Sequence, residues 1–393
     1  MTSISHAVAS AHTSAAPTAT TRNAALDRAR TFLTLVVLLH HAVIPYTYFG
    51  HTDRKSWPGF DAVVLATDSF FMAMFFFLSG LFVWPSLAHK STWGFLRDRL
   101  LRLGLPFAIA AFTIIPIAYY AYALRQTDVA FAAFWWKTVT VGPWPSGPIW
   151  FVWVLLVFDL SASLLYRRSP GLLDPINRLS LRGFDDPARF FLFLFGVTAI
   201  VYVPARLYFG PSYWFEFGPF DVQANRVLLY AAYFFIGAGI GAAHFDRGVL
   251  SANGRLAKSG WGWAVATLVP YALMWGLIAI KRELLGNPDV LPAWYEAIYG
   301  LCLTAFSAAI LLAILAFFLR LKSSGWSMLD SMQNDAYGIF LVHYPIVLWL
   351  QYWLFDYNLH AIFKASIAFV LTVVLSWAVT RALRKIPGAT KVL

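Results

Sequence analysis

The stretch LDRARTFLTLVVLLHHAVIP, residues 26–45, decides the fold class of this chain. Eleven positions separate Arg30 from His41, about three turns at about 3.6 residues per turn, so the two side chains share one face. With a rise of about 1.5 Å per residue, His41 lies about 16 Å beyond Arg30, near the middle of a hydrocarbon core about 30 Å thick. The stretch is therefore predicted to be a membrane helix with an arginine at one rim and an ionisable group at depth.

The two histidines of this helix face different ways, because neighbouring positions differ by about 100°. An ionisable side chain inside a membrane is costly and is a functional candidate by default. The alternative is a histidine whose hydrogen bonds are satisfied by a neighbouring helix, and it applies more strongly to His40 than to His41. His41 is therefore the candidate catalytic residue, with Arg30 on the same line.

The composition indicates a polytopic membrane protein. Of the 393 residues, 60% are hydrophobic and only 12% are charged, whereas a soluble domain has about 25% charged residues. The net charge of +11 could suggest nucleic acid, but basic cytoplasmic loops account for it and no nucleic-acid partner is expected. The single cysteine, Cys302, excludes an intramolecular disulfide and a Cys-based zinc cluster.

Apolar runs predict an all-α bundle of about ten membrane helices and no separate soluble domain. They are expected near residues 27–49, 60–84, 103–124, 147–166, 190–205, 227–243, 261–280, 294–318, 336–355 and 361–382. Residues 1–22 are predicted to form a disordered cytoplasmic tail, residues 23–385 the membrane domain, and residues 386–393 a short cytoplasmic tail.

The distribution of basic residues predicts the orientation of the bundle. With the N-terminus in the cytoplasm, 21 of the 30 lysines and arginines fall on the cytoplasmic side and nine on the other. Cytoplasmic loops carry such an excess. Both termini are therefore expected in the cytoplasm.

A second basic cluster lies in FLRDRLLRLGLPF, residues 95–107, which is expected to lie in a basic loop leading into the third helix. Arg99 and Arg102 are three apart and would be neighbours on one helical face. Guanidinium groups grip phosphate oxygens in two-point fashion, so the pair suits a diphosphate. The alternative is that these charges only hold the preceding span in place. The residues alone leave both readings open.

Other ionisable residues fall inside predicted helices. Asp68 could orient His41 or another polar group, or pair with an arginine. His343 lies about 12 Å into the ninth predicted helix and is a candidate for lining a reaction cavity. Asp159 and Glu296 are near helix ends and are expected at the interface. No zinc, P-loop or Ser-His-Asp signature appears, so no metal is expected.

These stretches resemble the acyltransferase-3 family of bacterial membrane acyltransferases. The first helix of that family carries an arginine, ten intervening residues and a histidine, which match Arg30 and His41. An Arg-x-x-Arg motif implicated in coenzyme A binding matches Arg99 and Arg102.

Three weaker segments are similar to the family as well: FFFLSGLF with Ser79, GPIWFVWVLL, and YGIFLVHYP with His343. The resemblance spans about residues 26–345, so residues 23–385 are expected to form an acyltransferase-3-like membrane domain. One family branch carries a C-terminal hydrolase-like domain outside the cytoplasm. This chain ends in RALRKIPGATKVL and resembles the stand-alone form.

The resemblance implies transfer of an acyl group, such as acetyl or succinyl, from acyl-coenzyme A to a hydroxyl. The acceptor would be a glycan or another molecule of the cell envelope, and the protein would lie in the bacterial inner membrane. His41 would act as general base, Arg30 could bind donor phosphate, and Arg99 and Arg102 would hold the diphosphate. Acyl-coenzyme A is then a co-substrate and no cofactor is permanently bound. An acyl-histidine intermediate is an open alternative.

The rival function is a proton-coupled secondary transporter, which also uses intramembrane His and Asp residues as a proton relay. Transporters usually show an internal repeat with broken helices in matching positions of two halves. Neither feature is visible here, and a transporter has no need of the double-arginine segment. The sequence therefore favours an acyltransferase.

Overall fold

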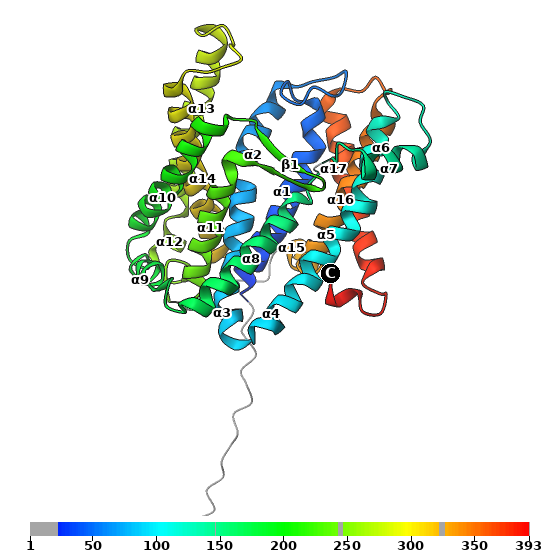
Figure 1. Cartoon of the computed structure of the whole chain (residues 1–393). Coiled ribbons are helices and arrows are strands. Elements are labelled where there is room, and N and C mark those ends of the chain that lie inside the picture. Colours follow the sequence, from blue (N-terminus) through cyan, green and yellow to red (C-terminus); the bar gives the residue numbers. More distant parts are fainter. Residues whose placement is uncertain (1–22, 146, 243–246, 322–326, 393) are drawn as a thin grey trace, which may run out of the picture.

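The computed structural model describes residues 23–145, 147–242, 247–321 and 327–392, which are mostly helical (Figure 1). Within these ranges nine helical segments are long and apolar enough to cross a membrane. They are Ala24–Tyr46, Pro58–His89, Thr92–Ala123, Trp150–Arg168, Pro187–Phe209, Ala224–Gly241, Gly260–Glu283, Ala293–Arg320 and Ala361–Leu383. The predicted all-α membrane bundle is confirmed.

The ninth helix of the sequence prediction is α16 (Ala336–Leu354), which is not among these nine segments. Its 19 residues include His343, Gln351 and several tyrosines and tryptophans, which lower its hydropathy. It packs against α17 (Ala361–Leu383), α6 (Ile115–Ala123) and α1 (Ala24–Val43). By length and position α16 completes the bundle, and its polar residues are explained by the site described below.

Helices α1 and α2 (Pro58–Gly80) occupy the centre of the bundle (Figure 1). The most apolar windows of their spans are 67% and 72% buried, against 17% for peripheral α13 (Gly260–Glu283). Helices α10 (Pro187–Phe209), α11 (Val227–Gly241), α13 and α14 (Ala293–Arg320) lie on one side, and α6, α16 and α17 on the other.

Close backbone packing joins α2 to α11. A Cβ atom at Gly80 would meet the carbonyl oxygen of Phe234, and one at Gly237 would meet that of Phe77. Small residues permit such approaches between membrane helices. The glycines therefore let α11 lie directly against the central helix.

The third span differs from the prediction, because its first residues form a helix rather than a basic loop. Helix α4 (Thr92–Arg99) is capped by Ser91, whose side chain accepts a hydrogen bond from the Gly94 amide, and α5 (Leu105–Ile109) and α6 continue the span. Two π-helical turns, η2 (Leu100–Gly104) and η3 (Ala110–Ile114), join these pieces. Each π turn precedes a proline, Pro106 or Pro116, whose missing amide hydrogen interrupts the α pattern.

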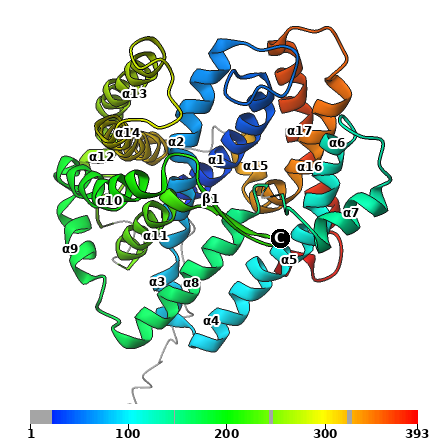
Figure 2. The same ribbon diagram turned by 45° about the horizontal axis from the view of Figure 1, so that its top comes forward.

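A β-hairpin that the sequence did not predict connects α10 to α11. Strands β1 (Trp214–Phe217) and β2 (Phe220–Gln223) pair antiparallel, with Glu216 opposite Asp221. The Phe220 ring packs against Phe107 of α5 and Trp153 of α8 (Trp150–Arg168). The hairpin thus lies across α8 and reaches toward α5 (Figure 2). A 3-10 turn, η4 (Ala224–Arg226), leads from it into α11.

Short helices and turns occupy several predicted loops, the end of the first predicted helix and the predicted C-terminal tail. They are α3 (Val83–His89), α7 (Phe131–Thr140), α9 (Asp174–Arg182), α12 (Arg255–Lys258), α15 (Ser327–Met332), η1 (Ile44–Tyr46) and η5 (Ala389–Lys391). The predicted tail at residues 1–22 lies outside the described residues.

Candidate functional site

His41 lies near the end of α1 and meets His343 of α16. The Nδ1 atom of His41 is 3.0 Å from the Val37 carbonyl oxygen and 3.3 Å from Nε2 of His343. The Nδ1 atom of His343 is 2.6 Å from the Phe340 carbonyl oxygen. Because carbonyl oxygens only accept, both Nδ1 atoms carry hydrogen. His343 Nε2 is then an acceptor, and His41 keeps its lone pair on Nε2.

This arrangement suits His41 to accept a proton. Its Nδ1–H group points at the Val37 oxygen and the His343 ring, and both stabilise the positive charge that forms when Nε2 is protonated. His343 is fully buried, whereas His41 is partly exposed. The sequence analysis chose both histidines as site residues, and the structure brings them together.

Helix α16 also holds His41 in place from two other directions. The ring of Tyr344 lies edge-on to His41, with centroids 5.2 Å apart, and its hydroxyl donates to the Tyr119 hydroxyl at 3.1 Å. Gln351 donates from Nε2 to the backbone oxygen of His41 at 2.7 Å. These contacts restrict the orientation of the imidazole.

His40 has the satisfied environment that the sequence analysis gave as the alternative. It is 6% exposed, and its Nδ1 atom is 2.8 Å from the Thr67 hydroxyl of α2. The Thr67 hydroxyl donates to the Val63 carbonyl oxygen at 2.8 Å, so it accepts from His40. His40 thus links the two central helices.

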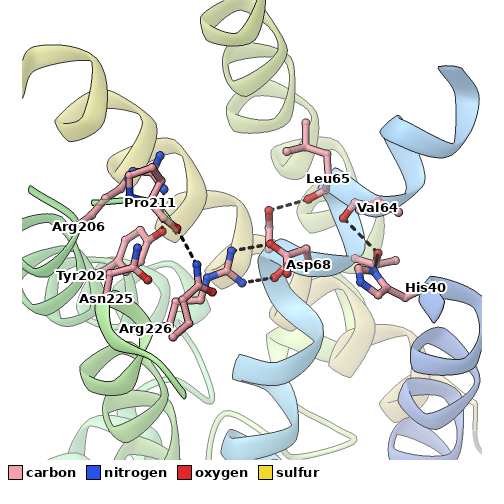
Figure 3. Close-up of polar contacts among 12 residues, drawn as sticks. His40, Val64, Leu65, Asp68, Tyr202, Arg206, Pro211, Asn225 and Arg226 are labelled. Carbon is pink, nitrogen blue, oxygen red and sulfur yellow. Dashed lines mark hydrogen bonds and ion pairs between the residues drawn. The ribbon is translucent and has the colours of Figure 1, made fainter. Parts of the chain in front are cut away.

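Asp68, the next residue on α2, pairs with Arg226 of η4 (Figure 3). Their Oδ2 and Nη2 atoms are 2.5 Å apart, and Nη1 of Arg226 donates to the Asp68 backbone oxygen at 2.8 Å. Of the alternatives for Asp68, pairing with an arginine is the one found. Its side chain is 46% exposed although α2 is a central helix.

Arg30 lies toward the N-terminal end of α1, near Ser79 of α2. Its Nη2 atom donates to the Leu78 carbonyl oxygen at 3.3 Å, its Nη1 atom is 3.4 Å from Asp27, and its guanidinium lies 4.2 Å from the Phe82 ring centroid. Arg30 and Ser79 are both partly exposed. They share one end of the bundle, and His41 lies eleven positions farther along α1.

Arg99 and Arg102 have different surroundings, contrary to the expectation of two matched neighbours on one face. The Arg99 Nε atom is 3.1 Å from Oδ2 of Asp159 in α8, whereas the Arg102 side chain is exposed. The Arg102 backbone oxygen accepts a hydrogen bond of 2.6 Å from the Tyr337 hydroxyl. The π turn that begins at Leu100 changes the helical spacing between the two arginines.

Asp159 and Glu296 were both expected near helix ends, and the structure places them differently: Glu296 is the fourth residue of α14, whereas Asp159 is the tenth of the 19 residues of α8. Asp159 is 1% exposed and pairs with Arg99. Glu296 is 7% exposed and lies 2.5 Å from Arg206 of α10. Both carboxylates are buried, and a guanidinium from another helix compensates the burial of each.

The sequence analysis missed the polar segment that joins the hairpin to α11, from Asp221 to Arg226. Asp221 and Asn225 are buried, and Arg226 provides the partner of Asp68. Burial, and then the neighbouring charge of Glu216, raise the pKa of the Asp221 carboxyl to about 6. An arginine directly before an apolar run was the available signal, but it reads equally well as a charge at a helix end.

The comparisons with known proteins give one family. A family model described as an acyltransferase domain matches residues 23–381. This range includes every candidate residue described above. No match was found among curated proteins or among solved structures. Among the described residues, no group of three or more His, Cys, Asp or Glu side chains could hold a metal ion.

Proposed function

Because the chain belongs to the acyltransferase-3 family, as its motifs predict, it is a multi-pass membrane acyltransferase, and we propose that it transfers an acyl group from acyl-coenzyme A to a hydroxyl. The acceptor is a glycan or another molecule of the cell envelope. The observation that carries this proposal is the contact between His41 and His343, because it leaves the His41 Nε2 lone pair available for a proton.

The reaction uses His41 as a general base. A hydroxyl is a poor nucleophile at neutral pH, so Nε2 of His41 takes its proton as the oxygen attacks the thioester carbonyl carbon. The carbon–sulfur bond breaks when the tetrahedral intermediate collapses, and the imidazolium returns the proton to the leaving thiolate. Such base catalysis contributes about 10² to 10⁴ in rate.

The donor occupies the end of the bundle that carries the arginines. Arg102 is exposed, Arg99 is held by Asp159, and Arg30 lies at the start of α1. Guanidinium groups bind phosphate oxygens well. The coenzyme A diphosphate therefore docks at Arg99 and Arg102, and Arg30 contacts donor phosphate or the pantetheine arm on the way to His41.

The orientation follows from the distribution of basic residues. Coenzyme A thioesters are cytoplasmic, and the segment with Arg99 and Arg102 belongs to the side with 21 of the 30 lysines and arginines. The protein thus lies in a bacterial inner membrane with both termini in the cytoplasm. Family membership disfavours the secondary-transporter alternative.

The test compares the envelope glycans of cells with and without the gene by mass spectrometry, together with coenzyme A release by purified protein. Acetyl-coenzyme A or succinyl-coenzyme A is supplied to the purified protein together with the glycan fraction from cells that lack the gene. A mass difference equal to one acyl group, restored in vitro from one donor, supports the proposal. Identical glycans and no acceptor-dependent coenzyme A release would rule it out.

A further inference from the structure

The segment from β2 to the start of α11 buries polar atoms that have no hydrogen-bond partner in the part of the chain that the structure describes. They are both carboxylate oxygens of Asp221, Oδ1 of Asn225 and Nε of Arg226. The three residues are 1%, 0% and 8% exposed. Most buried polar groups in proteins are paired, and an unpaired one costs free energy. Three such side chains within six residues indicate a binding site for a polar ligand.

Asp68 supplies an accessible group on the facing helix. Figure 3 shows the Arg226 and Asp68 side chains directed toward one another, with Asn225 beside Arg226 and His40 on the far side of Asp68. The amide of Asn225 is anchored, because its Nδ2 donates to the Gly210 oxygen at 2.6 Å, which leaves its carbonyl oxygen free to accept. The side chain of Asp68 is 46% exposed, so a ligand can reach its carboxylate.

Aromatic rings adjoin this polar segment. Trp150, the first residue of α8, stacks on Tyr230 of α11 with centroids 5.4 Å apart and meets Trp214 of β1 at 6.5 Å. Trp153 donates from Nε1 to the backbone oxygen of Asp221 at 3.1 Å. A sugar ring has apolar C–H faces and a rim of hydroxyls, so it suits aromatic faces beside carboxylate, amide and guanidinium groups.

The charges of the segment favour a neutral ligand. The positive charge of Arg226 is balanced by Asp68, and Asp221 is an acidic residue. An anionic ligand would therefore find no unpaired cation among these residues. Thr67, the neighbour of Asp68, bonds His40, which adjoins His41. The His40 and His41 ring centroids are 5.4 Å apart, so a ligand at Asp68 would lie on the part of α2 that is linked to the proposed base through Thr67 and His40.

We propose that Asp68, Asp221, Asn225 and Arg226, with the ring of Trp150, bind the acyl acceptor, and that the acceptor is a neutral carbohydrate. That the bound sugar is the acyl acceptor rests on the proposed function, whereas the binding of a neutral sugar at this site does not. The hydroxyls bond to the unpartnered atoms of the segment, and the ring faces lie on the aromatic side chains.

Sugar binding tests the proposal without catalysis. The full chain is placed in lipid nanodiscs, since maltoside detergents would compete, and maltotriose binding is measured by saturation-transfer NMR, with glucose 6-phosphate as the anionic comparison. Asp221→Asn keeps the side-chain shape and breaks no hydrogen bond of the structure, and Arg226→Gln removes the guanidinium. Each variant is expected to bind maltotriose about tenfold more weakly, the effect of one hydrogen bond to a charged group.

The matched control is Ser163→Ala. Ser163 is also buried with an unpartnered oxygen, but it lies 13 positions beyond Trp150 on α8, and its loss should leave binding unchanged. Three outcomes would each overturn the proposal. The unsubstituted protein does not bind maltotriose, both site variants bind it as tightly as the unsubstituted protein, or glucose 6-phosphate binds more tightly than maltotriose.

Two further readouts separate this inference from the proposed function. Binding of acetyl-coenzyme A by the variants shows that the donor half is folded. If Asp221 and Arg226 control sugar binding but no coenzyme A is released, the reaction is wrong and the site stands. If coenzyme A release is normal in the variants and sugar binding is unaffected, the site is wrong and the reaction stands.

Discussion

The Nε2 atom of His343 lies 3.3 Å from the Nδ1 atom of His41, across 302 positions of sequence. The hydrogen bonds of both rings to backbone oxygens give this contact a direction, from His41 as donor to His343 as acceptor. His41 therefore resembles a catalytic base and His343 the partner that orients it, an arrangement common in sites that activate a nucleophile. It also explains why a helix of the bundle carries a histidine at depth.

The first prediction separates the two histidines of α1. His41→Ala should lower turnover by about 10² or more, with acyl-coenzyme A binding retained, because the base is lost. His41→Gln keeps hydrogen bonding but cannot take the proton, so it should be equally inactive. His40→Ala is the control and should show the smaller loss of a packing change. Coenzyme A release is the assay, and an active His41→Gln enzyme would exclude the base role.

The second prediction concerns His343 as a positioning residue. His343→Ala should lower kcat by about tenfold or more while the KM for acyl-coenzyme A stays unchanged, since only the imidazolium of His41 loses its partner. His343→Gln, which can still accept through its side-chain oxygen, should recover part of kcat. A merely structural role would instead lower the amount of folded protein and leave the kcat of the remainder intact.

Sequence patterns predicted the helical bundle and the candidate residues Arg30 and His41, because both predictions depend on local features of the sequence. Long apolar runs mark the membrane helices, and the eleven-residue spacing places Arg30 and His41 on one face. His343 was also recognisable as a buried ionisable group. Its contact with His41 was not, since nothing local in α16 says which neighbour its face meets.

The hairpin and the polar segment after it escaped prediction for a different reason. Residues 210–226, GPSYWFEFGPFDVQANR, show no sustained alternation and are rich in glycine, proline and aromatic residues, which is typical of a loop. Asp221 and Arg226 become recognisable only when α2 and α8 supply their surroundings. The ion pairs of Asp159 and Glu296 were not predicted for the same reason, because their partners Arg99 and Arg206 come from other helices.

The third prediction uses the raised pKa of Asp221. A carboxyl whose pKa is about 6 in the folded protein, against about 3.9 when unfolded, binds more protons in the folded state between these values. The free energy of unfolding should therefore fall as the pH rises from about 4 to about 6, by an amount on the order of 1 kcal/mol. Asp221→Asn should abolish this decline, measured by thermal unfolding in nanodiscs over that range. An identical pH dependence in the variant would contradict the prediction.

The fourth prediction concerns topology. In a Cys302→Ala background, Lys258→Cys and Lys391→Cys should react with a membrane-impermeant maleimide only after the cells are permeabilised. Lys137→Cys and Arg282→Cys should react in intact cells. All four positions are exposed in the structure or lie in terminal turns, so failure to label is not explained by burial. Labelling of position 391 from outside would demand an odd number of spans.

The last prediction separates the two arginines of the donor segment. Arg102→Ala should raise the KM for acyl-coenzyme A about tenfold without loss of stability, because the side chain is exposed and its proposed role is to contact the donor. Arg102→Lys should recover part of the affinity, since it keeps the charge but lacks the fork. The matched control is Arg97→Ala, because Arg97 is an exposed arginine of the adjoining helix α4.

Arg99→Ala should behave differently, because it leaves the buried carboxylate of Asp159 without its partner. We expect a loss on the order of 2 kcal/mol in the free energy of unfolding, reduced from the value for a fully buried pair because the Arg99 side chain is 23% exposed. Adding Asp159→Asn should recover this stability but not the donor affinity. If Asp159→Asn alone leaves the KM for acyl-coenzyme A unchanged, Arg99 does not need the carboxylate to hold it in position. If the double variant, Arg99→Ala with Asp159→Asn, also recovers donor affinity, Arg99 makes no contact with coenzyme A.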